Sequence, residues 1–196
     1  MDGGNTGQRR RGRGGRERIL AAATSLFAAH GINATGMEQV AAAAPVSKRT
    51  LYAHFPAKDD LVVAYLRHLT ESGRTLESVL DREDLDPRER ILALFTIPHD
   101  GTGPVRGCPF VDAAAEFPDP GSPVHAYTRE QKRRFALRLA ELLTGLGAAE
   151  PGALGEQLAM LADGAASRAM VLNDTACGRH ARTAAQALLD AALAEP

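Results

Sequence analysis

Residues 35–58 read TGMEQVAAAAPVSKRTLYAHFPAK, and this stretch is the most informative part of the chain. It predicts a short helix from about Met37 to Ala44, a tight turn, and a second short helix from about Ser47 to His54. The hydroxyl of Ser47 can accept a hydrogen bond from the free backbone N–H groups at the start of the second helix. The apolar residues that would pack two helices at a steep angle are Val40, Ala41, Val46, Leu51 and Phe55.

Polar side chains occupy the other faces of the second helix. Lys48 and Arg49 carry positive charge, and Tyr52 places a phenol at the rim. A capped helix with a cationic outer face, held by a scaffold helix, has the geometry that enters the major groove of DNA. We therefore interpret the segment as a nucleic-acid-binding unit.

The segment closely resembles the helix-turn-helix of TetR-type transcriptional regulators, whose pattern is Thr-x-x-x-x-(Ile/Val)-Ala-x-x-Ala-Gly-Val-Ser-x-x-Thr-Leu-Tyr-x-(His/Tyr)-Phe-x-x-Lys. The resemblance extends upstream to Arg16 and covers roughly the first third of the chain. The chain departs from the pattern at Pro45, where glycine is usual; proline favours φ near about −65°, whereas glycine tolerates positive φ. The matching positions are Thr35, Val40, Ala41, Ala44, Val46, Ser47, Thr50, Leu51, Tyr52, His54, Phe55 and Lys58.

The resemblance implies an all-α fold of about nine helices. An N-terminal three-helix DNA-binding domain, with its helix-turn-helix at about residues 36–55, would precede a C-terminal helical domain for ligand binding and dimerisation. Lys48 and Arg49 are the candidates for base edges, because Lys and Arg can donate to guanine O6 and N7. The DNA-binding residues that we expect are Thr35, Ser47, Lys48, Arg49, Thr50, Tyr52, His54 and Lys58, with phosphate contacts expected at Thr35, Tyr52, His54 and Lys58.

Charge divides the chain in the same way. Residues 1–58 hold nine Lys/Arg and three Asp/Glu, whereas residues 59–196 hold fourteen and twenty-one. A basic N-terminal unit suits a polyanionic partner, although two unrelated surface biases would give the same counts. We expect a disordered basic arm at residues 1–15, a DNA-binding domain at 16–58 and a ligand-binding and dimerisation domain at 59–196. The arginines of this region, which either follow DNA phosphates or only solvate the tail, are Arg9, Arg10, Arg11, Arg13 and Arg16.

The rest of the chain also reads as helical. Apolar residues recur at helical spacing, and no segment shows the sustained alternation of a half-buried strand. We therefore expect no sheet. The helices predicted outside the central segment span about 16–30, 58–84, 87–97, 110–116, 123–144, 152–173 and 179–194.

The helix at about 152–173 carries two weakly polar stripes. One contains Leu154, Leu158 and Leu161, and the other contains Met160 and Gly164. A helix with two such faces packs on two sides, either wholly within its own subunit or with a second copy of the chain. We favour a homodimer, because one helix-turn-helix makes few contacts and two half-sites of a palindromic operator on double-stranded DNA remedy this.

Aromatic and sulfur-containing side chains gather around the loops of the C-terminal part. In the TetR family a small-molecule cavity lies between the fourth helix and the helices that follow, and an inducer bound there would move the fourth helix. Ordinary core packing explains the same residue types. The candidates for the cavity are Phe95, Phe110, Phe117, Tyr127, Phe135, Met160 and Met170.

Other chemistry finds little support in the sequence. The six histidines are scattered and form no familiar ligand motif, so we expect neither a metal nor a cofactor. Asp112 and Glu116 lie four residues apart and form either a site for a cation or a solvated face. Cys108 lies near Arg106, so its thiol is either redox-active with a lowered pKa or inert. No phosphate loop, nucleophile elbow or dinucleotide fingerprint indicates an enzyme.

The start of the chain, MDGGNTGQRRRGRGGR, lacks the apolar run of a signal peptide, and no apolar stretch of about 18 residues follows. We therefore expect a cytoplasmic protein with no membrane partner. The sequence predicts a DNA-binding transcriptional regulator, a repressor released from its operator by a small-molecule inducer. The alternatives are a helical small-molecule-binding or enzymatic protein that has lost DNA function, and a regulator that senses redox state through Cys108.

Overall fold

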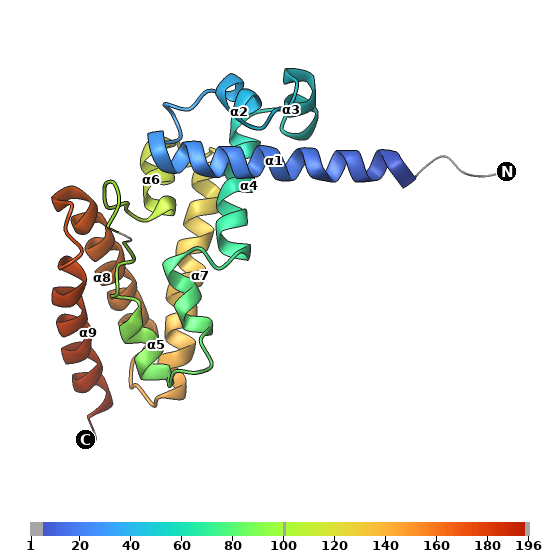
Figure 1. Ribbon diagram of the computed structural model, residues 1–196. Helices are drawn as coiled ribbons and strands as arrows, with labels where there is room; N and C mark the ends of the chain where they lie inside the picture. Colours follow the sequence, from blue (N-terminus) through green and yellow to red (C-terminus); the bar gives the residue numbers. More distant parts are fainter. Residues whose placement is uncertain (1–5, 100, 195–196) are drawn as a thin grey trace.

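The computed structural model describes residues 6–99 and 101–194, with side chains from residue 14 onward. This part of the chain contains nine α-helices, one 3-10 helix and no strand, which confirms the predicted all-α class. Figure 1 shows α1 lying across the molecule, with α2 and α3 above it and the long helices of the C-terminal part below it. The elements are α1 (Thr6–His30), α2 (Met37–Ala43), α3 (Lys48–His54), α4 (Lys58–Glu71), η1 (Leu76–Asp81), α5 (Pro87–Ala93), α6 (Pro109–Glu116), α7 (Pro123–Gly145), α8 (Pro151–Leu172) and α9 (Cys177–Leu193).

The first helix begins earlier than the sequence predicts. The sequence predicts a disordered arm at residues 1–15 and a helix from about Arg16, but α1 already begins at Thr6. Arg and Gln are good helix formers, and extending an existing helix costs less than nucleating a new one, so the glycines of this segment do not end the helix. Residues 1–5 lie outside the described residues. The start of α1, from Thr6 onward, therefore extends beyond the other helices (Figure 1).

The prediction of one long helix over about 58–84 is wrong, because α4 ends at Glu71. Gly73 adopts φ +64°, a left-handed conformation that glycine tolerates without steric cost. The Arg74 N–H then donates to the Leu69 carbonyl at 2.9 Å, and the Gly73 N–H donates to the Thr70 carbonyl at 3.2 Å. These two bonds form a Schellman cap, after which the chain turns into the short helix η1.

The described part of the chain contains two large apolar cores and one small apolar cluster. The first joins α1, α2, α3 and α4, and it extends to Phe110 of α6 and Val124 of α7. The second joins α5, α7, α8 and α9 around residues such as Leu139 and Leu158, both fully buried. The first core therefore brings α6 and α7 of the C-terminal part into contact with the helices of the helix-turn-helix region.

The helices α7 and α8 pack closely along their length. Gly155 makes this approach possible, since a Cβ atom at this position would lie 2.8 Å from the Ala136 carbonyl oxygen. Within the described residues, no helix combines the length and the apolarity that crossing a membrane requires.

Candidate nucleic-acid interface

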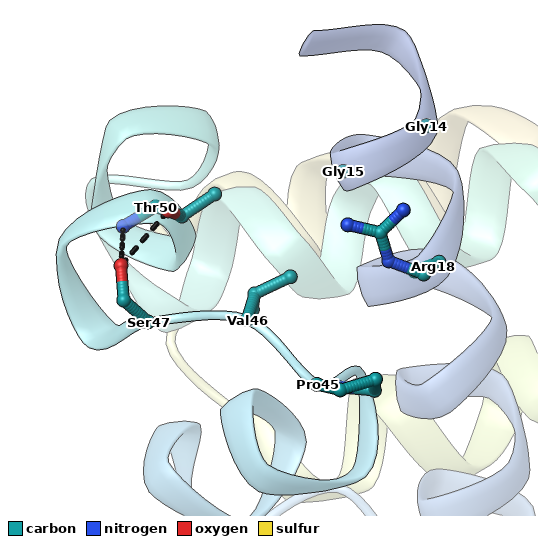
Figure 2. A pocket seen from close by; sticks show the side chains of 7 residues that line it. All are labelled: Gly14, Gly15, Arg18, Pro45, Val46, Ser47 and Thr50. Atoms are coloured by element: carbon teal, nitrogen blue, oxygen red, sulfur yellow. Dashed lines mark hydrogen bonds between the residues drawn. The ribbon is translucent and has the colours of Figure 1, made fainter. Parts of the chain in front are cut away.

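The helix α3 is capped at its start as the sequence predicts. The Ser47 hydroxyl accepts a hydrogen bond from the Thr50 N–H at 3.1 Å, and the two hydroxyls lie 2.8 Å apart (Figure 2). Leu51 is fully buried and Phe55 is 3% exposed, so the apolar face of α3 anchors it to α1, α2 and α4. The opposite face of α3 therefore remains free in this fold.

That free face carries the predicted base-reading side chains. Lys48 and Arg49 are both exposed, and Tyr52 is 46% exposed. The Lys48 ammonium pairs with Glu38 of α2, which raises the pKa of Lys48 through a hydrogen bond and charge attraction. Both partners are exposed to water, so the pair contributes little stability and can exchange for a DNA contact. No ion pair among the described residues includes Arg49.

Three other predicted DNA-binding residues have partners within the protein or lie partly in its interior. Thr35 is only 2% exposed, and its hydroxyl donates to the Gly31 carbonyl at 2.8 Å. Lys58 donates to the Asn33 carbonyl at 3.3 Å, and partial burial lowers its pKa. His54 is half-buried at the end of α3. Thr35 thus stabilises the end of α1 and offers almost no surface to a phosphate.

A groove of about 710 Å³ separates α1 from α3 and the preceding turn, and its lining residues are shown in Figure 2. Arg18 of α1 is exposed and lies on one side, while Ser47 and Thr50 lie on the other. Gly15 brings α1 close to α3, because a Cβ atom there would lie 3.2 Å from His54 Nε2. The sequence does not single out Arg18; only the crossing of α1 over α3 reveals its position.

The turn before α3 accommodates Pro45 with a distorted backbone. Its φ is +22°, far from the value that the pyrrolidine ring prefers. The turn still closes, because the Val46 N–H donates to the Ala41 carbonyl at 3.1 Å. Proline has no N–H for the second hydrogen bond that usually accompanies such a helix end. The helix-turn-helix therefore forms despite the missing glycine.

A second set of contacts ties the C-terminal part to the loop between α1 and α2. The Glu116 carboxylate, at the end of α6, accepts hydrogen bonds from the Ile32 N–H at 3.0 Å and from the Asn33 N–H. We call this pair of hydrogen bonds the Glu116 contact. Nearby, the Arg106 guanidinium donates to the Ala29 carbonyl at 2.7 Å. Glu116 therefore forms neither a cation site nor a merely solvated face, the two alternatives that the sequence left open, because its partners are backbone N–H groups.

The C-terminal part contains a cavity of about 520 Å³, which we call the cavity below η1. It is bounded by η1, α7, α8 and the segment that leads into α6. Of the residues predicted to line a ligand site, only Phe110 lines this cavity. Phe95 and Phe135 belong to the second core, and Phe117 and Tyr127 pack against the first. Met160 is 64% exposed, and Met170 lines a separate pocket beside α1 and α6. Residue type alone does not distinguish cavity walls from ordinary core.

Cys108 also lines the cavity below η1, and its surroundings differ from those predicted for a reactive thiol. Burial raises the pKa of Cys108 above its ordinary value, whereas redox sensing requires an accessible thiolate. Arg106 does not activate the thiol, since its guanidinium binds the Ala29 carbonyl of α1. Of the two alternatives for Cys108, the raised pKa therefore favours the inert thiol.

A capped, exposed helix on a scaffold helix defines the chain as a helix-turn-helix DNA-binding protein. The family model "Bacterial regulatory proteins, tetR family" matches residues 19–65. A TetR-family transcriptional regulator from Streptomyces coelicolor has a solved structure that aligns with a TM-score of 0.81 and 31% identity, over 93% of this chain and 97% of that chain. The HTH-type transcriptional regulator LmrA of Bacillus subtilis is 30% identical over 139 residues, or 69% of this chain and 74% of LmrA.

An HTH-type transcriptional repressor of Mycobacterium tuberculosis is 42% identical over 81 residues, which cover 38% of this chain and 43% of the repressor. The chain belongs to the TetR family of bacterial regulatory proteins and is a DNA-binding transcriptional regulator. The family consists of regulators and not of enzymes, which confirms the prediction that the chain is not an enzyme. Regulators of this family bind DNA and typically act as dimers.

Proposed function

We propose that the protein is a homodimeric repressor that binds an inverted-repeat operator in the cytoplasm and leaves it when a small-molecule inducer binds. The observation that carries the DNA-binding part is the outward face of α3, where Lys48, Arg49 and Tyr52 are exposed while Leu51 holds the helix in the core. We assign residues 16–58 to the DNA-binding domain and residues 59–196 to ligand binding and dimerisation.

In this proposal Arg49 is the principal base reader. Arginine donates two parallel hydrogen bonds to guanine in the major groove, and Arg49 gives up no ion pair among the described residues to do so. Lys48 contributes after exchanging its bond to Glu38 for a DNA acceptor. Contacts to phosphates fix the position of the protein on the duplex, and we assign them to Tyr52, His54, Lys58 and Arg18. Arg18 replaces the buried Thr35 in this set.

Dimerisation is proposed through a surface that we call the α8/α9 face. A groove of about 650 Å³ runs along it, lined by Met160 and Leu161 of α8 and by Ala184, Ala187 and Leu188 of α9. Gly164, one turn further along α8, has open space around its Cα. Small residues allow two helices of each subunit to approach closely, and twofold symmetry would give the operator matching half-sites.

The proposed response to inducer uses the contacts between α6 and the DNA-binding domain. Arg106 and Gly107 line the cavity below η1, and the same Arg106 binds the carbonyl of Ala29 in α1. The Glu116 contact at the other end of α6 holds the loop that precedes α2. A ligand that changes the position of α6 would therefore move α1 and α2, provided that it binds the two arrangements with different affinity.

The experiment is an electrophoretic mobility shift with DNA taken from beside the protein's own gene, at several salt concentrations. The proposal expects a specific complex that survives competition by unrelated DNA, and loss of that complex in a Lys48→Ala/Arg49→Ala variant. A matched variant, Arg129→Ala/Arg133→Ala, removes two exposed cations from α7 and should bind like the parent. Equal competition by unrelated DNA would contradict specific operator binding.

A further inference from the structure

The cavity below η1 has an apolar body and a polar wall. Its apolar lining includes Leu76, Ile97, Phe110, Ala162 and Ala166. The polar wall is formed by Glu77 of η1, Lys132 of α7 and Asp163 of α8. A volume of about 520 Å³ accepts a small organic molecule, which would bury its apolar part against these side chains.

The positive and negative charges of this wall do not cancel. The Lys132 ammonium lies 2.6 Å from the Asp163 carboxylate, and their side chains are only 25% and 32% exposed. Glu77 is partly buried and belongs to no ion pair among the described residues. Burial raises the pKa of Glu77, and the neighbouring positive charge of Lys132 offsets this only in part. The wall therefore holds two carboxylates for one ammonium.

Other cations near this wall are already engaged or lie in water. Arg138 pairs with Asp81, and Arg134 is exposed on α7. Arg74 and Arg106 lie at the edge of the cavity, and both are exposed. Water and salt screen exposed charges more than partly buried ones, so these exposed arginines offset the Glu77 carboxylate less than a buried cation would.

We propose that the cavity below η1 binds an organic cation, an amine with an apolar body, whose ammonium group donates hydrogen bonds to the Glu77 carboxylate. The apolar body lies against Phe110, Leu76 and Ile97. The Lys132–Asp163 pair remains intact and fixes the wall between α7 and α8. This inference rests on the proposed function, because it names the chemical class of the inducer.

The test uses three probes with the same apolar body: phenylbutylamine, phenylbutyrate and phenylbutanol. Calorimetric titration into the full-length protein measures binding, and fluorescence anisotropy of labelled operator DNA in parallel samples measures DNA release. Glu77→Gln preserves the shape of the side chain and removes its charge. Glu83→Gln makes the same change on an exposed residue outside the cavity and serves as the matched control.

The amine should bind the parent protein and the Glu83→Gln variant equally, and bind Glu77→Gln at least about tenfold more weakly, as expected when a charge-assisted hydrogen bond is removed. The alcohol and the carboxylate should bind the parent more weakly than the amine does. Tighter binding of phenylbutyrate, unchanged amine affinity in Glu77→Gln, or binding of none of the three probes would overturn the proposal.

The two readouts separate this inference from the proposed function. If phenylbutyrate or phenylbutanol binds better and releases the operator, the regulator is ligand-responsive and only the cationic class is wrong. If the amine binds through Glu77 without affecting DNA, the site is correct and its role as an inducer site is wrong.

Discussion

Glu116 and Asn33 are joined by hydrogen bonds that run in both directions. The Glu116 carboxylate accepts from the Asn33 backbone N–H, and the Asn33 side-chain amide donates to the Glu116 backbone carbonyl at 3.2 Å. These bonds connect the last residue of α6 to the loop that leads into α2. They give α6 a direct contact with this loop that does not involve α4.

Glu116→Gln should loosen the loop between α1 and α2. The substitution replaces one acceptor oxygen with an NH₂ group, which faces a backbone N–H donor. We expect faster hydrogen exchange at the Ile32 and Asn33 amides and a decrease of about 1 kcal/mol in unfolding free energy. Glu141→Gln, an exposed position on α7, is the matched control. Unchanged exchange at these two amides would show that the Glu116 contact does not hold the loop.

Pro45→Gly should stabilise the DNA-binding domain. Glycine tolerates the left-handed φ at this turn, and it restores the N–H that proline lacks. The greater freedom of glycine in the unfolded chain offsets part of the gain, so we expect a net increase of about 1 kcal/mol in unfolding free energy. Chemical denaturation of the parent and the variant measures the difference in unfolding free energy. A destabilised variant would mean that the turn does not strain the proline.

The helix-turn-helix is the part of the molecule that the sequence predicts best, and the reasons are local. Ser47, Leu51 and the turn act within a few residues of each other, so spacing alone predicts α2, α3 and the cap. The break after α4 is not predicted, because Gly73 is a single residue within a helical pattern and such a residue does not by itself indicate a stop. Arg18, the Glu116 contact and the cavity below η1 depend on which distant elements meet, which one sequence does not reveal.

Removing the basic segment that begins α1 should weaken DNA binding on any sequence. Residues 1–15 contain Arg9, Arg10, Arg11 and Arg13, and α1 extends this segment beyond the other helices. For each phosphate that the protein no longer neutralises, the slope of log affinity against log salt should become shallower by about 0.9. A variant with glutamine at these four positions keeps the length of the segment and should behave like the deletion. A slope equal to that of the parent would exclude phosphate binding by this segment.

Gly164→Glu should separate the subunits. Gly164 lies on the α8/α9 face in open space, so the fold of one subunit accommodates the new side chain. In the proposed dimer the same glutamate would be buried without a partner, which costs several kcal/mol. Light scattering should report the mass of a monomer. The variant should remain folded and bind the operator more weakly. Gly145→Glu, at the exposed end of α7, should remain dimeric.

A Gly164→Glu variant that stays dimeric would place the interface elsewhere. A monomer that still binds the complete operator as tightly as the parent would contradict the requirement for two half-sites.

Selection of binding sites from random DNA tests whether Arg49 of α3 reads bases in the major groove. The parent protein should enrich an inverted repeat, and Arg49→Ala should lose preference at one base position of each half-site, with an affinity cost of about 1–3 kcal/mol at the parental site. Arg133→Ala, an exposed arginine of α7, should select the parental sequence. An identical sequence preference for the parent and Arg49→Ala would contradict base reading by Arg49.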